Sequence, residues 1–138
     1  MKMILLFLIA AIALTSGCSD TVHGREIAEP EIPLFHERLD AGKFDLIYDN
    51  ADAEFKKTVP KQKIEALFAA VGRKLGKHKS SKQVNWNVRT FNGVTNVALA
   101  YETEFTDGEA TETFTFQVSN GKAKLMGYNI SSLDMLIK

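Results

Sequence analysis

The chain has 138 residues and one cysteine, with 17 basic and 17 acidic residues that give a formal net charge of zero. This length is sufficient for one domain with a substantial core and too short for two. A single cysteine excludes an intrachain disulfide, so packing alone must hold the fold together. The charges are clustered, with acids dominating 19–54 and 102–112 and bases dominating 56–82. Such blocks are typical of solvated faces, and they could also steer a charged partner.

Residues 1–17 have the features of a signal peptide. Lys2 precedes an apolar run at 4–14, which is shorter than the roughly 20 residues that a membrane span needs. The sequence LTSGC at 14–18 resembles the lipobox of bacterial lipoproteins. This resemblance implies cleavage before Cys18 and acylation there with palmitate-type chains, and more than one acyl chain makes anchoring stable. Ser19, in place of a retaining aspartate, implies an outer-membrane lipoprotein facing the periplasm. The alternative is a plain secreted protein with a free thiol.

Residues 18–32 are predicted to be a tether, because they lack a periodic apolar pattern and contain Gly24 and Pro30. A single domain is expected over 33–138. Its first helix is predicted at 33–42, between a proline suited to a first turn and a glycine suited to a C-cap. A second follows from Phe44 toward Phe55. The third is predicted from Thr58–Pro60 to Gly76, because apolar residues recur there every three or four positions.

From Ser80 onward the apolar pattern has a period of two, which predicts strands. Asn-Gly pairs at 92–93 and 120–121 and an Asp-Gly pair at 107–108 favour two-residue hairpin turns, and thus four strands. These turns predict a definite register. The expected pairs are Val88 with Val97, Trp86 with Leu99, Val84 with Tyr101, Tyr101 with Phe114, Leu99 with Phe116, Val97 with Val118, Phe116 with Leu125, and Phe114 with Gly127. All three turns place these residues on one face, with Trp86 buried against the third helix.

The predicted fold class is therefore α+β, with three N-terminal helices packed on a four-stranded antiparallel meander. This arrangement resembles the cystatin-like roll, in the branch named after nuclear transport factor 2. More narrowly, the sequence at 39–44, 55–57, 75–76 and 127–130 resembles a group of uncharacterised small bacterial exported proteins. The resemblance implies a cone between sheet and helices, in which enzymes such as ketosteroid isomerase hold acids and tyrosines. Relatives without those groups serve as binding or assembly modules.

One candidate ligand cleft lies in this predicted cone. The expected register places Thr103, Glu112 and Asn129 in one row, beyond Tyr101 and near Trp86. A carboxylate flanked by neutral hydrogen-bonding groups could hold the polar end of a ligand, or act as a base if burial raised its pKa. The alternative is a wet rim with a Glu112 of ordinary pKa, and with Gly127 marking a bulge. We expect the rim, because no second titratable group shares the row. His36 is expected at the surface.

A second candidate surface is an apolar strip on the outer face of the sheet. Met126, Tyr128 and Ile130 alternate there, and either the C-terminal segment or a second copy of the chain could cover them. No metal or cofactor is expected, because the three histidines lack metal-ligand spacing and no other thiol is present. Nucleic acid is not an expected partner in the cell envelope.

These features predict a membrane-anchored, extracytoplasmic lipoprotein that acts as a non-catalytic binding or assembly module. Two other functions fit the same sequence. One is a small enzyme that uses Glu112 in the cone. The other is an immunity or inhibitor lipoprotein against an exported toxin, with its acidic first helices as the contact.

Overall fold

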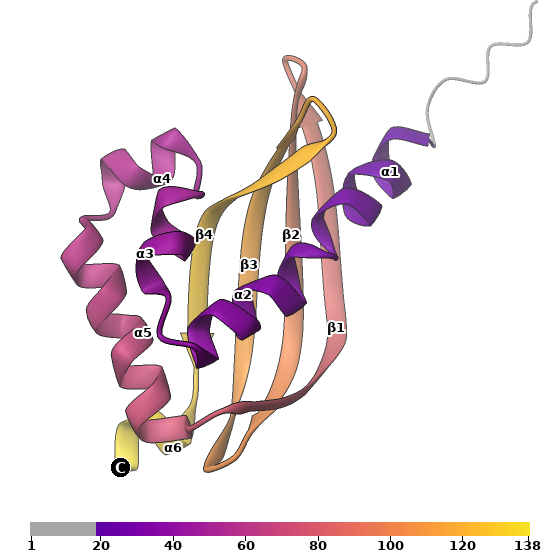
Figure 1. The fold of residues 1–138 in the computed structure, drawn as a ribbon. Coiled ribbons are helices and arrows are strands. Elements are labelled where there is room, and N and C mark those ends of the chain that lie inside the picture. The colour runs from indigo at the N-terminus through magenta and orange to yellow at the C-terminus, as the bar shows by residue number, and fades with distance from the viewer. Residues whose placement is uncertain (1–18) are drawn as a thin grey trace, which may run out of the picture.

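The computed structural model describes residues 19–138, so Cys18 and the predicted signal peptide lie outside the described residues. One antiparallel sheet carries helices on one of its faces (Figure 1). The strands are β1 (His78–Phe91), β2 (Val94–Phe105), β3 (Gly108–Ser119) and β4 (Lys122–Ser131), in the order β1-β2-β3-β4. The helices are α1 (Ser19–Ala28), α2 (Glu31–Asp40), α3 (Phe44–Asp49), α4 (Ala53–Thr58), α5 (Lys61–Leu75) and α6 (Leu133–Ile137). The α+β class and the four-stranded meander are thus confirmed.

The helical region differs from the prediction at its start. Residues 19–28, expected in a tether, form α1, which packs across the sheet. Ala28 and Ile32 are buried in the core, and the backbone at Gly24 lies against Val88, Thr95 and Val97. The expected second helix is divided into α3 and α4, since Asp52 begins a new helix by accepting a hydrogen bond from the backbone N–H of Glu54.

Helix α5 has the predicted limits. Ile64, Phe68, Val71 and Leu75 recur every three or four residues and are all buried. Gly76 ends the helix with φ of +81°, and a Cβ there would lie 2.0 Å from Thr106 Oγ1. This glycine is therefore required both by its backbone conformation and by the close approach of the β2–β3 turn.

Two of the three predicted hairpin turns are confirmed. Asn92-Gly93 and Asn120-Gly121 have positive φ at both residues, as a two-residue hairpin turn of this type requires. The middle turn uses Thr106 and Asp107, because Phe105 pairs with Gly108. The backbone N–H groups of Thr106 and Asp107 donate to the carbonyls of Lys77 and Leu75, so the link between α5 and β1 holds this turn.

The shifted turn changes the pairing of β2 with β3 by two residues. The expected partners were wrong, and Leu99 faces Phe114, Val97 faces Phe116, and Tyr101 faces Glu112. A shift of two keeps every side chain on its predicted face. The same apolar residues therefore still form the core.

Two bulges alter the outer strands. In β1, the register shifts between Gln83 and Asn85, so Val84 does not pair with Tyr101 as expected.

In β4, Met126 is the extra residue, because Phe116 pairs with Leu125 while Thr115 pairs with Gly127. Phe114 consequently faces Tyr128 and not Gly127.

The bulge in β4 overturns the predicted outer strip. Tyr128 and Ile130 pack against the core, while Asn129 is exposed opposite Thr113. The C-terminal segment forms α6, which packs against α5 and β3.

Trp86 is not buried against the third helix as expected. It faces Leu99 in the predicted register, yet 44% of its surface is exposed. The reason is its place on the edge strand, where α1 and not α5 covers the sheet; the Arg25 guanidinium lies 5.0 Å from the centre of the Trp86 ring.

Candidate functional site

A fully buried carboxylate, that of Glu112, lies at the centre of a polar cluster on the core face. It comes from β3, and its neighbours come from α2, β2 and β4. His36 Nε2 lies 2.8 Å from Glu112 Oε2, and Thr103 Oγ1 donates to the same oxygen at 2.6 Å. Tyr128 OH donates to Oε1 at 2.6 Å. Both carboxylate oxygens are thus occupied by donors from the protein itself.

The environment of Glu112 favours its charged form. Burial opposes ionisation most strongly, but the hydrogen bond and positive charge of His36 and the hydrogen bonds from Thr103 and Tyr128 outweigh it and lower the pKa of Glu112. Burial, together with the adjacent charge of Glu112, raises the pKa of Tyr128 well above its usual value. The phenol therefore stays protonated and acts as a donor.

A chain of hydroxyl groups connects Glu112 to a half-buried histidine. Ser81 Oγ lies 3.1 Å from Thr103 Oγ1 and 2.8 Å from His78 Nε2. An ionised Glu112 can only accept, so the Thr103 hydroxyl proton points to it. Ser81 must then donate to Thr103, and His78 Nε2 must donate to Ser81. The carboxylate thus fixes the direction of every hydrogen bond in the chain and the tautomer of His78.

The two histidines of the cluster stack on each other, with ring centres 4.0 Å apart and planes inclined by 15°. Burial, followed by the charge of His36, lowers the pKa of His78, although Asp40 and Glu112 oppose this. Asp40 also accepts a hydrogen bond from the backbone N–H of His78. Two adjacent positive charges are therefore disfavoured at the stacked pair.

The structure assembles only part of the predicted cleft. Thr103 and Glu112 are bonded, and Tyr101 pairs with Glu112 along the strands. Trp86 lies at the edge and Asn129 faces outward, so neither belongs to the cluster. The predicted wet rim at Glu112 was wrong, as was the surface position of His36, which is 3% exposed.

Four residues of the cluster were missed: His36, His78, Ser81 and Tyr128. For His36 the sequence does contain a signal, since Ile32, Phe35, His36 and Leu39 follow the spacing of one buried helical face. For Tyr128 no such signal exists, because only the bulge at Met126 turns it inward.

Aromatic rings fill the space around this cluster. The ring of Phe35 lies 5.5 Å from that of Phe68, 4.9 Å from Phe114 and 4.8 Å from Tyr128, measured between centroids. The predicted cone is therefore packed with side chains at this point.

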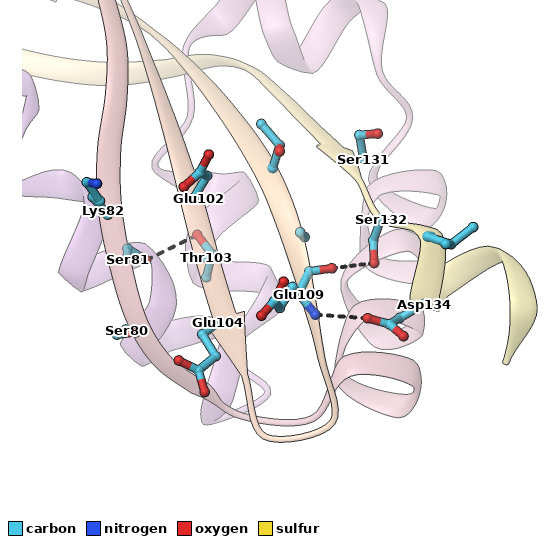
Figure 2. Close-up of a pocket in the computed structure, with 13 residues that line it drawn as sticks. Ser80, Ser81, Lys82, Glu102, Thr103, Glu104, Glu109, Ser131, Ser132 and Asp134 are labelled. Carbon is cyan, nitrogen blue, oxygen red and sulfur yellow. Dashed lines mark hydrogen bonds between the residues drawn. The ribbon is translucent and has the colours of Figure 1, made fainter.

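A hollow lies on the opposite face of the sheet, at the end that carries the β2–β3 turn and α6 (Figure 2). Its volume is about 680 Å³. Most of its lining is polar: Ser80, Ser81, Lys82, Glu102, Thr103, Glu104, Glu109, Thr111, Ser131, Ser132 and Asp134. Alternation along the strands explains this, because residues next to Thr103 and Glu112 point outward.

The hollow is negatively charged and has an apolar border. Lys82 is its single lining cation, against four carboxylates. Lys79 pairs with Glu104 and Lys138 with Asp134, whereas Glu102 and Glu109 form no ion pair within residues 19–138. On α6, beside the hollow, Leu133, Leu136 and Ile137 are each at least 70% exposed. This combination of charge and exposed apolar surface is typical of a contact surface.

The fold and these surfaces define a small α+β protein with a saturated buried cluster and an open outer hollow. The chain matches, over residues 35–128, the family described as protein of unknown function (DUF4019). The chain belongs to this family. No curated protein matches the chain. In the described part of the chain, no helix is long and apolar enough to cross a membrane, and no group of three or more metal-ligating side chains is arranged to hold a metal ion.

Proposed function

We propose that the protein is a membrane-anchored lipoprotein of the cell envelope, held at Cys18 on the periplasmic side of the outer membrane, and that it acts as a non-catalytic binding module. The apolar run at 4–14 and the LTSGC sequence at 14–18 support the anchor. The helices on one face of an antiparallel meander support its classification as a cystatin-like roll.

The state of Glu112 supports a binding module over a cone-pocket enzyme. A catalytic base must reach the proton of a substrate directly or through one water. Each oxygen of Glu112 already accepts a short hydrogen bond, and its side chain is fully buried. The cluster instead fastens α2, β2, β3 and β4 to one another.

The observation that carries the proposal is the outer hollow with its apolar border. Glu102 and Glu109 offer charge, the hydroxyl groups of Ser80, Thr111 and Ser131 offer hydrogen bonds, and α6 offers exposed leucines. This combination fits a segment of a partner protein that carries basic residues beside apolar ones. Apolar anchors surrounded by a polar rim are the usual composition of such interfaces.

An NMR titration of the full chain in phospholipid nanodiscs with tetralysine tests the hollow. We expect shifts at Glu102, Glu109 and Ser132, and at least tenfold weaker binding after Glu102→Gln with Glu109→Gln. The matched control is Glu26→Gln with Glu37→Gln, two exposed acids outside the hollow. An equal loss of tetralysine affinity in both double variants would mean general charge attraction and would refute the site.

Cell fractionation tests the anchor. Cys18→Ser removes the thiol that acylation needs, so we expect the processed protein to leave the membrane fraction and lose incorporation of labelled palmitate. Wild-type protein that is processed yet soluble without detergent would contradict the anchor.

A further inference from the structure

The direction of α1 shows from which end the N-terminal segment joins the domain. Near the end of α1, Gln83 Nε2 donates to Glu29 Oε1 at 3.1 Å, and Arg25 donates to Gln83 Oε1 at 2.6 Å. One turn earlier, Gly24 lies against Val88 and Thr95. Moving back along α1 therefore means moving up β1 toward its turn at 92–93. The chain reaches Ser19 at the end of the sheet that carries the β1–β2 and β3–β4 turns (Figure 1).

That end of the sheet exposes apolar and basic groups. Phe91 is 77% exposed and Val94 is 39% exposed, on either side of the turn. Arg89, Lys122 and Lys124 are exposed on the two hairpins. Neither hairpin contains an acid, over 87–96 and 117–125. The β2–β3 hairpin at the other end has five acids over 102–112.

We infer that the tips of the β1–β2 and β3–β4 hairpins form a membrane-contact surface, in which Phe91 enters the interface of the bilayer and Arg89, Lys122 and Lys124 bind anionic lipid phosphates. Phenylalanine is among the apolar residues that interfacial segments bury at the boundary of headgroups and acyl chains, and basic residues are attracted to anionic leaflets. The chain enters the domain at this same end, so the anchor would present these groups to the bilayer.

The inference rests on the proposed membrane anchor and adds an orientation to it. The outer hollow would then lie at the end of the sheet remote from the membrane. From Val94 to Thr103 along β2 this separation is roughly 30 Å, at about 3.3 Å per residue. A partner could reach the hollow without meeting the bilayer.

Tryptophan quenching by brominated phospholipids tests this orientation. The full chain is reconstituted in vesicles of phosphatidylglycerol and phosphatidylethanolamine with brominated acyl chains. A background of Trp86→Phe removes the native indole. Phe91→Trp then reports on the hairpin tip, and Leu136→Trp is the matched control, because Leu136 is an 82% exposed apolar residue at the opposite end. We expect at least threefold stronger quenching at position 91.

Three results distinguish the possible failures. Protein that floats with the vesicles but is quenched equally at both positions, or more at 136, overturns the inference and leaves the anchor standing. Protein that does not float overturns both. Replacing phosphatidylglycerol by phosphatidylcholine should reduce quenching at 91, as should Arg89→Ser with Lys122→Ser and Lys124→Ser. Unchanged quenching in both cases would refute the role of the basic residues. A hairpin that contacts protein and not lipid would give no quenching at position 91, and this result would overturn the inference.

Discussion

Polar residues close together on β2 and β3 lie in two opposite environments. Thr103 and Glu112 point inward and form a dry cluster with His36, while Glu102 and Glu109 point outward and line an open hollow. Residue type is shared, and the alternation of strand residues decides which glutamate is buried. The inner carboxylate accepts hydrogen bonds from buried side chains, whereas the outer ones are exposed. The face of the sheet on which an acid of this segment lies therefore decides whether it is buried in the core or exposed.

The largest difference between the faces should appear on removal of a carboxylate. Glu112→Ala leaves His36, Thr103 and Tyr128 buried without their acceptor, so we expect a loss of about 3–5 kcal/mol in the free energy of unfolding. Glu102→Ala should change it little, because its side chain is exposed. Urea denaturation of both variants measures the loss in the free energy of unfolding, and similar losses would contradict this prediction.

Acid should weaken the inner cluster in two stages. The lowered pKa of His78 means that the unfolded chain binds its proton more readily, so stability declines as the pH falls below 6.5, the usual histidine value. The lowered pKa of Glu112 likewise means that its contribution, complete above the usual value of 4.5, is lost as the pH falls through the folded-state pKa. Thermal unfolding from pH 8 to pH 3 tests this.

Control variants locate each stage. His78→Gln should remove the first decline, and Glu112→Gln should remove the second. A wild-type protein of constant stability from pH 8 to pH 3 would refute the charged cluster.

A single hydrogen bond of the cluster can be removed at nearly constant volume. Tyr128→Phe deletes the donor to Glu112 Oε1, and a bond to a charged group contributes about 1.5–3 kcal/mol, so we expect a loss in this range. Thr113→Val, on the outer face of the same strand pair, is the control. A silent Tyr128→Phe would place the tyrosine outside the cluster.

The smallest expected effect is at a side chain that faces the core but is partly exposed, compared with one that is fully buried. Trp86→Ala should cost about 1–2 kcal/mol, because the ring is 44% exposed and its cation–π contact with Arg25 adds only about 0.5–1 kcal/mol. Phe114→Ala, fully buried on the same face, should cost about 3–5 kcal/mol. Equal losses in calorimetry would show that the β1 edge is as well covered as the centre.

The sequence was sufficient for features that local chemistry determines. The limits of α5 and the two Asn-Gly turns depend on capping and on positive φ, and both are readable from residue type. The predicted turn at Asp107-Gly108 was wrong because the link between α5 and β1 holds the backbone N–H groups of Thr106 and Asp107, which places the turn one residue earlier. Such contacts depend on distant parts of the chain.

The site was harder to predict for the same reason. His36 and Glu112 are 76 residues apart, and their partnership depends on how α2 crosses the sheet. Thr103 and Glu112 were placed together by alternation alone, although in the wrong register. Trp86 and Asn129 were misplaced because edge position and the bulge in β4 decide their exposure.

The bulge at Met126 also bears on how strand length can vary in the family. Removing one residue from a regular strand normally exchanges its two faces. Here, deletion of Met126 would leave Gly127 opposite Thr115 and Tyr128 opposite Phe114, as they already are. Relatives that lack one residue at this point would therefore keep the same inward tyrosine, and an alignment gap here would mark an equivalent site, not a lost one.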